Sequence, residues 1–171
     1  SFHSYLPADL SPEIGEKLVD VWIKKLRDNP ELHDKIEFDV AITAFSFDID
    51  EKIDKLTANV LDQKEKKLFR ESVRSQTHKL LLDNCASGIS SCVNKMNKLV
   101  ERQEKYKKTK GLNDSNVLFS MIEDCIRLGT IPFSKLARHG FIARTLLLSL
   151  KSRGIINENE VNLIQGSAHT V

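Results

Sequence analysis

The sequence has no long apolar run and no sign of a secretory leader. No stretch of its 171 residues approaches the ~18 consecutive apolar residues that a membrane-spanning helix needs. No basic segment followed by an apolar one opens the chain, so we expect no signal peptide. Apolar residues make up 40% of the sequence and charged residues 29%, which is typical of a soluble globular protein. We therefore expect no membrane partner.

Cysteine is scarce and unpaired. The three cysteines are Cys85, Cys92 and Cys125, and no two of them form a CxxC pair. Each lies in an apolar, helical context, which favours reduced and buried thiols over disulfides or a zinc site. Because thiols stay reduced in the cytoplasm, the expected location is cytoplasmic.

The sequence also lacks the common catalytic motifs. Its seven glycines are isolated, so it has no glycine-rich phosphate loop, and neither GxSxG nor HExxH occurs. The five histidines are scattered rather than spaced as metal ligands. Four carboxylates lie close together at Glu37, Asp39, Asp48 and Asp50, but their spacing matches no EF-hand loop and is more typical of solvated side chains. The residues alone predict neither a catalytic centre nor a metal or cofactor site in this chain.

An excess of charge of one sign is missing as well. There are 26 Lys and Arg against 24 Asp and Glu, a net charge of +2, which is too balanced to attract nucleic acid over the whole surface. The local exception is the basic run KYKKTK, residues 105–110. Such a run is more often a solvated helix end than a phosphate or nucleic-acid site. We expect no nucleic-acid partner.

The most distinctive stretch that is present runs from Gly129 to Val161. Residues 133–150 within it are apolar on nearly every side, which predicts a central helix that other elements cover. Pro132 precedes this segment, and Lys151, Arg153 and Gly154 follow it, as expected for the start and end of a helix.

Three cationic side chains accompany the predicted central helix. Arg144 falls within the apolar stripe, and Arg138 and His139 lie just before it. Because a guanidinium keeps its charge, Arg144 must find an anionic partner. That partner is either a carboxylate of this chain, which is the commoner case, or a bound ligand.

The whole pattern predicts one mainly α domain, of about six helices, with a small β element near residues 36–45. Residues 1–50 would hold an extended lead-in, an amphipathic helix and the strand, which alternates apolar and polar side chains. Residues 51–112 would form a helical hairpin, and residues 113–171 the central helix and its cap. Neither end of the chain resembles that of a complete gene product, so we expect a domain of a longer protein.

Two passages carry a resemblance to a known family. They read YLPADLSPEIGEKLVDVWIKKLRDNPELHDKIEFDVAITAFSFD, residues 5–48, and LGTIPFSKLARHGFIARTLLLSLKSRGIINENEVNLIQGSAHTV, residues 128–171. Both are similar to the segment of bacterial phosphoenolpyruvate synthase-like enzymes that follows the ATP-grasp domain and precedes the swivelling phosphohistidine domain. The resemblance is strong at the two ends of the chain and weak in the middle helices.

The resemblance implies a middle part of a phosphotransferase that uses ATP or phosphoenolpyruvate, one that binds the phosphoryl acceptor or docks the neighbouring domains. Those domains would be the partners of this segment, together with a small-molecule acceptor, and ATP and Mg would serve the parent enzyme outside it. His169 lacks the paired-glycine motif of the family's carrier histidine, so we expect the isolated segment to be inactive.

The residues expected to bind substrate follow from this interpretation. Arg138, His139 and Arg144 are candidates for an anionic acceptor group or for a phosphate on a neighbouring domain, and Glu37 and Asp39 are candidates for a polar acceptor. The alternative hypothesis is a non-catalytic helical domain that binds a protein partner, which would expose an apolar patch along residues 62–110.

Overall fold

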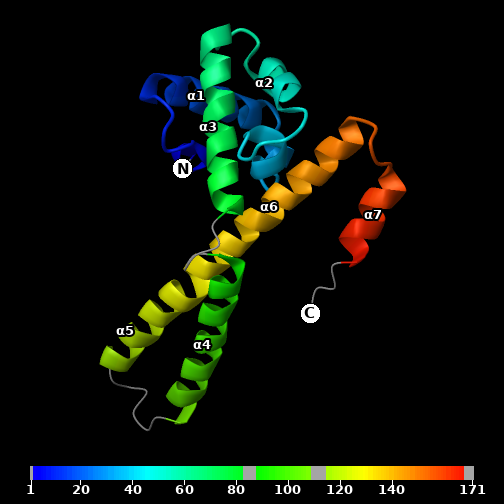
Figure 1. The fold of residues 1–171 in the computed structure, drawn as a ribbon. Helices are drawn as coiled ribbons and strands as arrows, with labels where there is room; N and C mark the ends of the chain where they lie inside the picture. The colour runs from blue at the N-terminus through cyan, green and yellow to red at the C-terminus, as the bar shows by residue number, and fades with distance from the viewer. Residues whose placement is uncertain (1, 83–87, 109–114, 168–171) are drawn as a thin grey trace. The chain divides into compact units, whose positions relative to one another are not determined.

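The computed structural model describes residues 2–82, 88–108 and 115–167. These residues contain seven α-helices and no strand, so the predicted mainly α fold is confirmed (Figure 1). Contacts divide the chain into two compact units. Unit 1 comprises Ser1–Lys79 and Phe141–Val171, and unit 2 comprises Leu80–Gly140. Among the described residues, no helix is both long and apolar enough to cross a membrane.

Helix α1 (Pro12–Asp28) opens unit 1 as predicted. The side chain of Ser11 caps it by accepting a hydrogen bond of 3.4 Å from the backbone N–H of Ile14. The predicted apolar stripe is confirmed, because Ile14, Leu18 and Trp22 are all buried. At the far end the backbone N–H of Asn29 donates to the carbonyl of Lys25, which closes the last turn.

The predicted strand near residues 36–45 is wrong. Residues 36–40 form the π-helical turn η3 (Ile36–Val40), in which the N–H of Ala41 donates to the carbonyl of Ile36 over 2.8 Å. A single extended segment has no partner strand, so its backbone groups must be satisfied in another way. The tight turn does this locally and still buries Val40 and Ala41 in the core.

After η3, side-chain hydroxyl groups accept hydrogen bonds from the backbone of the chain. The N–H of Phe45 donates to the hydroxyl of Thr77 over 2.9 Å, and the N–H of Phe47 donates to the hydroxyl of Ser149 over 3.2 Å. Both hydroxyl-bearing residues are buried. Two helices thereby hold this segment where a neighbouring strand was expected to pair.

Two further helices follow in unit 1. The sequence analysis did not distinguish helix α2 (Ile49–Thr57) from the alternating apolar and polar residues before it. Ile49 and Ile53 of this helix are buried. Helix α3 (Gln63–Leu81) begins at a capping box. There the N–H of Glu65 donates to the carboxylate of Asp62, and the N–H of Asp62 donates to the carboxylate of Glu65.

Helix α7 (Glu158–Ser167) belongs to the same unit. Its cap is reciprocal, because Asn157 and Glu160 each accept the backbone N–H of the other. Val161 is buried, whereas 49% of the surface of Ile164 is exposed.

The core of unit 1 lies where α1, the η3 segment, α2 and α3 meet. Trp22, Leu18 and Phe69 are its largest fully buried side chains. Around them lie Ile14, Val19, Val40, Ala41, Ile49, Ile53, Leu61 and Val73.

Unit 2 contains helix α4 (Ile89–Lys108), helix α5 (Ser115–Asp124) and the π-helical turn η4 (Cys125–Thr130). Helix α4 packs against η4, where Gly129 lies so close to Leu99 that a Cβ at this glycine would come within 2.9 Å of it. The predicted hairpin of residues 51–112 stays a prediction, because α3 and α4 fall largely into different units.

A buried carboxylate ties the helices of unit 2 together. Asp124 is 3% exposed and accepts two hydrogen bonds, of 2.8 and 2.7 Å, from Arg102. It also accepts one of 2.9 Å from the hydroxyl of Tyr106. Burial raises the pKa of Asp124, but the hydrogen bonds from Arg102 and Tyr106 outweigh this, and the net pKa lies below its ordinary value.

Helix α6 (Ile131–Ser152) confirms the predicted helix and crosses from unit 2 into unit 1 at Phe141. The prediction that other elements cover it on nearly every side is wrong. Phe133 is 61% exposed and Ile131 is 49% exposed, whereas Ile142 and Ser149 are buried. Cys85, Lys110 and His169 lie outside the described residues.

Replacing Trp22 by alanine should lower the free energy of unfolding by about 3–5 kcal/mol, because a fully buried indole is lost from the centre of the core. Denaturant titration followed by circular dichroism would measure this. The control is Ile23→Ala on the same helix, where the side chain is 38% exposed and the expected loss is about 1 kcal/mol or less. Equal losses in the two variants would contradict the assignment of Trp22 to the core.

Replacing Asp124 by asparagine should lower the melting temperature at neutral pH by about 2–8 °C, because Arg102 and Tyr106 lose their charged acceptor. The pKa of Asp124 is lowered by folding, so its contribution is present above the ordinary carboxylate pKa of about 4. It disappears as the pH falls through the lower value of the folded state. The exposed neighbour Glu123→Gln serves as control and should melt like the parent chain at every pH.

Candidate functional site

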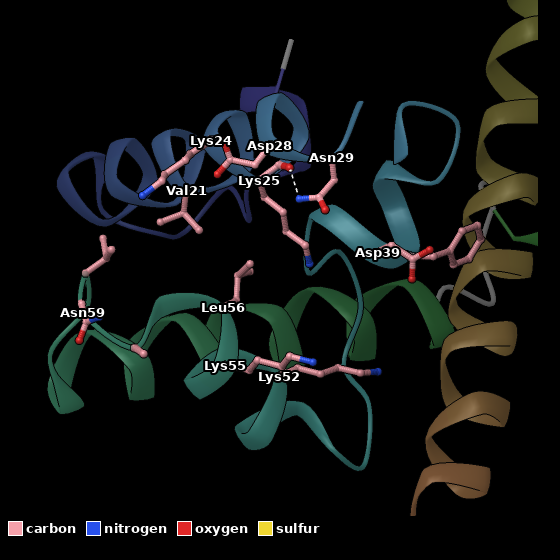
Figure 2. A pocket seen from close by; sticks show the side chains of 13 residues that line it. Val21, Lys24, Lys25, Asp28, Asn29, Asp39, Lys52, Lys55, Leu56 and Asn59 are labelled. Carbon is pink, nitrogen blue, oxygen red and sulfur yellow. Dashed lines mark hydrogen bonds between the residues drawn. The ribbon is translucent and has the colours of Figure 1, made fainter. Parts of the chain in front are cut away.

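A cavity of about 640 Å³ lies in unit 1. Helix α1 forms one wall, α2 and the residues after it form the opposite wall, and η3 closes one end (Figure 2). Pockets of a few hundred cubic ångströms are the usual size for small-molecule sites. This cavity is therefore the first candidate for a binding site.

Four of the residues that line this cavity are lysines. Lys24 and Lys25 come from α1, and Lys52 and Lys55 come from α2. The cavity is also lined by two carboxylates, Asp28 and Asp39, by two amides, Asn29 and Asn59, and by the apolar side chains Val21, Phe38, Leu56 and Val60. The arrangement suits a small molecule that carries negative charge.

Lys25 occupies the most constrained position of the four. Figure 2 shows its side chain reaching from α1 into the space between α1 and α2. Partial burial lowers the pKa of its ammonium group, Asp39 raises that pKa, and Lys55 lowers it again, with a net decrease. The ammonium groups of Lys25 and Lys55 thus repel each other, but the attraction of Asp39 exceeds this repulsion, and burial accounts for the net decrease in the pKa of Lys25.

A smaller cavity, of about 250 Å³, shares a wall with the first. Phe38, Asp39 and Lys52 line both cavities. The smaller one also contains Asp48, a buried carboxylate that accepts from Lys52 over 3.0 Å and from the hydroxyl of Ser152 over 2.9 Å.

Asp48 keeps its charge despite its burial. Burial raises its pKa, but hydrogen bonds from Ser46, Lys52 and Ser152 together lower it below the ordinary value. Lys52 is therefore already neutralised by a carboxylate outside the larger cavity. Lys24, Lys25 and Lys55 form no ion pair with any described residue.

The structure brings one of the two predicted acidic candidates to the larger cavity. Asp39 lines both cavities. Glu37 lines only the smaller one, and its carboxylate accepts a hydrogen bond of 3.0 Å from the hydroxyl of Tyr5. Asp39 is thus the candidate that remains available beside Lys25.

Arg144 has an aromatic partner. Its guanidinium lies 4.6 Å from the centre of the Phe38 ring, and Phe141 meets the same ring edge-on at 5.2 Å between centroids. No ion pair joins Arg144 to a described residue. Arg144 therefore fixes the ring of Phe38, which is part of the wall between the two cavities.

Arg138 and His139 belong to unit 2, whereas Arg144, Glu37 and Asp39 belong to unit 1. The two ring nitrogens of His139 lie 2.8 Å from the carbonyl of Lys135 and 3.2 Å from that of Leu80. A neutral imidazole has one N–H and can donate to only one of these carbonyls at a time. The backbone thus already engages the ring of His139.

The lysines of the larger cavity were missed by the sequence analysis. Lys24 and Lys25 appeared as the polar face of an amphipathic helix, and Lys52 and Lys55 fell at the predicted boundary after the strand. Ile49, Ile53 and Leu56 lie at helical spacing, which would have revealed α2 and placed these two lysines one turn apart. That α1 and α2 face each other follows only from their contact in three dimensions.

No group of three His, Cys, Asp or Glu side chains is placed to hold a metal ion within the part of the chain that the structure describes. Comparison of the chain with protein-family models, with curated proteins and with solved structures found no match. The cavity itself is therefore the main structural guide to function.

Replacing Asp39 by asparagine should lower the pKa of Lys25 further, because the carboxylate that favours its charged form is removed. Replacing Lys55 by methionine should raise it, because a repelling charge is lost. Titration of the lysine ammonium groups by NMR would measure both changes. Replacing Lys64, which is exposed on α3, by methionine is the control and should leave the pKa of Lys25 unchanged. An unchanged pKa of Lys25 in both variants would contradict the proximity of Lys25, Asp39 and Lys55.

Proposed function

We propose that this chain is the middle part of an ATP- or phosphoenolpyruvate-utilising phosphotransferase of the phosphoenolpyruvate synthase type, which binds the phosphoryl acceptor or docks neighbouring domains and is not catalytic alone. The parent protein would be an enzyme. Catalysis would depend on an ATP-grasp domain with ATP and Mg, and on a phosphohistidine domain, both outside this segment.

The observation that carries the proposal is the way the two resembling passages meet in unit 1, where residues of both line the smaller cavity beside the lysine-lined one. The hydroxyl of Ser149 accepts from the N–H of Phe47, Ser152 donates to Asp48, and Arg153 donates to the carbonyl of Phe47 over 2.6 Å. These pairs are separated by more than one hundred residues in sequence. Most of both passages belongs to unit 1, whereas the weakly resembling middle is divided between unit 1 and unit 2.

The charge of the cavity fits a role beside phosphoryl transfer. Phosphoryl transfer is catalysed mainly by positioning and by cations that offset the negative charge of the transferring group. Lys25 and Lys55 offer such charges from opposite walls, and Asp39 offers an acceptor for a hydroxyl group. Arg144 would support this site indirectly, through Phe38, while Arg138 and His139 remain candidates for contacts with another domain.

We further propose a cytoplasmic location. Cys92, which is buried, and Cys125, which is exposed, are both free cysteines. Free thiols of this kind are typical of proteins kept in a reducing compartment.

A non-catalytic protein-interaction domain is the second candidate, and one observation favours it. Unit 2 exposes large apolar side chains on α4 and α5. They are Ile89, Val93 and Val100 on α4, and Leu118, Phe119 and Ile122 on α5. Exposed apolar groups gathered on one unit often mark a surface that binds a protein.

The gene sequence on both sides of this chain tests the proposal directly. We expect an ATP-grasp domain encoded upstream of Ser1 and a paired-glycine histidine motif encoded downstream of Val171. The purified chain should then show no ATP-dependent phosphorylation, whereas the full-length protein should label on its carrier histidine.

A gene that encodes neither neighbouring domain would overturn the proposal and favour the protein-interaction domain. ATP-dependent phosphorylation of the purified chain by itself would contradict the expected lack of independent catalysis. Full-length protein with its carrier histidine replaced by alanine is the control for the labelling experiment.

A further inference from the structure

The larger cavity of unit 1 gathers positive charge at one end. Figure 2 shows the ammonium groups of Lys25, Lys52 and Lys55 on the side of the cavity where Asp39 lies. All three residues line the same cavity, and Asp39 and Lys55 shift the pKa of Lys25 in opposite directions. Three ammonium groups therefore share this end with one lining carboxylate.

This charge arrangement is costly without a ligand. Lys25 is partly buried, so water stabilises its ammonium group less than it stabilises an exposed one. Lys55 adds repulsion from the opposite wall, but the attraction of Asp39 exceeds that repulsion. Lys52 is held by Asp48. An anion placed between α1 and α2 would attract both Lys25 and Lys55 and would add a counter-charge beside the partly buried ammonium group of Lys25, and this gain would contribute to its binding.

The number and geometry of the charges favour phosphate over carboxylate. A phosphate monoester carries about −1.5 to −2 charges at neutral pH and offers three acceptor oxygens. It can thus accept hydrogen bonds from lysines on both walls at once, whereas a carboxylate brings a single charge and two oxygens.

The remaining lining groups describe the rest of the ligand. The carboxylate of Asp39 can only accept hydrogen bonds, so it suits a hydroxyl group and repels a second phosphate. The amide N–H of Asn29 already donates to the carbonyl of Lys25 over 2.9 Å, which leaves its oxygen as an acceptor. Val21 and Leu56 form an apolar part of the cavity wall. The body of the ligand is therefore small and hydroxylated.

We propose that the cavity between α1 and α2 binds the phosphate monoester of a small hydroxylated molecule, with Lys25 and Lys55 contacting the phosphate and Asp39 accepting from a hydroxyl group. This inference deepens the proposed function. The role of the ligand rests on the proposed function, whereas the chemistry of the ligand rests on the cavity.

Binding of three matched probes to the purified chain tests it. The probes are β-glycerophosphate, glycerate and glycerol, which share a hydroxylated body and differ in charge. We expect isothermal titration calorimetry to detect β-glycerophosphate binding and no glycerol binding. Lys25→Met and Lys55→Met should each weaken the affinity for β-glycerophosphate by about tenfold or more, because a charged contact is lost.

Lys64→Met, which removes an exposed lysine of α3, is the matched control and should leave the affinity unchanged. Absence of β-glycerophosphate binding, or binding that survives both cavity substitutions, would overturn the proposal. Glycerate binding as tight as that of β-glycerophosphate would overturn the assignment to phosphate.

A second measurement on the unaltered chain guards against variants that fail to fold. Reductive methylation with labelled formaldehyde, read by mass spectrometry, reports the reactivity of each lysine. β-Glycerophosphate should slow the modification of Lys25 and Lys55 at least about threefold relative to Lys64, and equal rates with and without the probe would refute the site. If the gene lacks the neighbouring domains while this protection holds, the proposed function fails and the phosphate site stands.

Discussion

The backbone of residues 41–48 imposes the constraint on which unit 1 depends. This segment has no neighbouring strand, yet it passes through the interior, where unpaired N–H groups are costly. The hydroxyls of Thr77 and Ser149 accept the N–H groups of Phe45 and Phe47. These two bonds connect α3 and α6 to the segment that joins η3 to α2. That segment joins two parts of the cavity. Phe38 and Asp39, which form part of the wall, precede it, and the helix that holds Lys52 and Lys55 follows it.

Local features were predictable because they need only a few neighbouring residues. The caps at Ser11, Asp62 and Asn157, and the buried stripe of α1, follow from side-chain chemistry within one or two turns. The strand was mistaken because its evidence was only local, namely the alternation and the β-branched and aromatic side chains of residues such as Ile36, Phe38 and Val40. A π-helical turn followed by an irregular segment can present the same alternation when buried hydroxyls, distant in sequence, satisfy the backbone.

The candidate site was harder to predict for a related reason. Asp39 was among the predicted residues, but its role in the candidate site depends on Lys25 and Lys55, which approach it from two helices. Nothing in a single sequence distinguishes a lysine on a solvated face from one that faces another lysine across a cavity. Arg144 shows the converse case. Its position in an apolar stripe indicated a buried guanidinium, but Arg144 is exposed and its guanidinium lies over the ring of Phe38.

The hydroxyl of Ser149 has a consequence for which residues this position tolerates. It donates to the carbonyl of Leu146 over 2.7 Å while accepting from Phe47, and Thr77 does the same between Val73 and Phe45. Each hydroxyl is therefore both donor and acceptor, a combination that serine and threonine provide within so small a volume. Valine, which matches threonine in shape, would fit the space at Thr77 and yet leave the backbone N–H of Phe45 without a partner. At Ser149, alanine would fit and would leave the N–H of Phe47 without its partner in the same way.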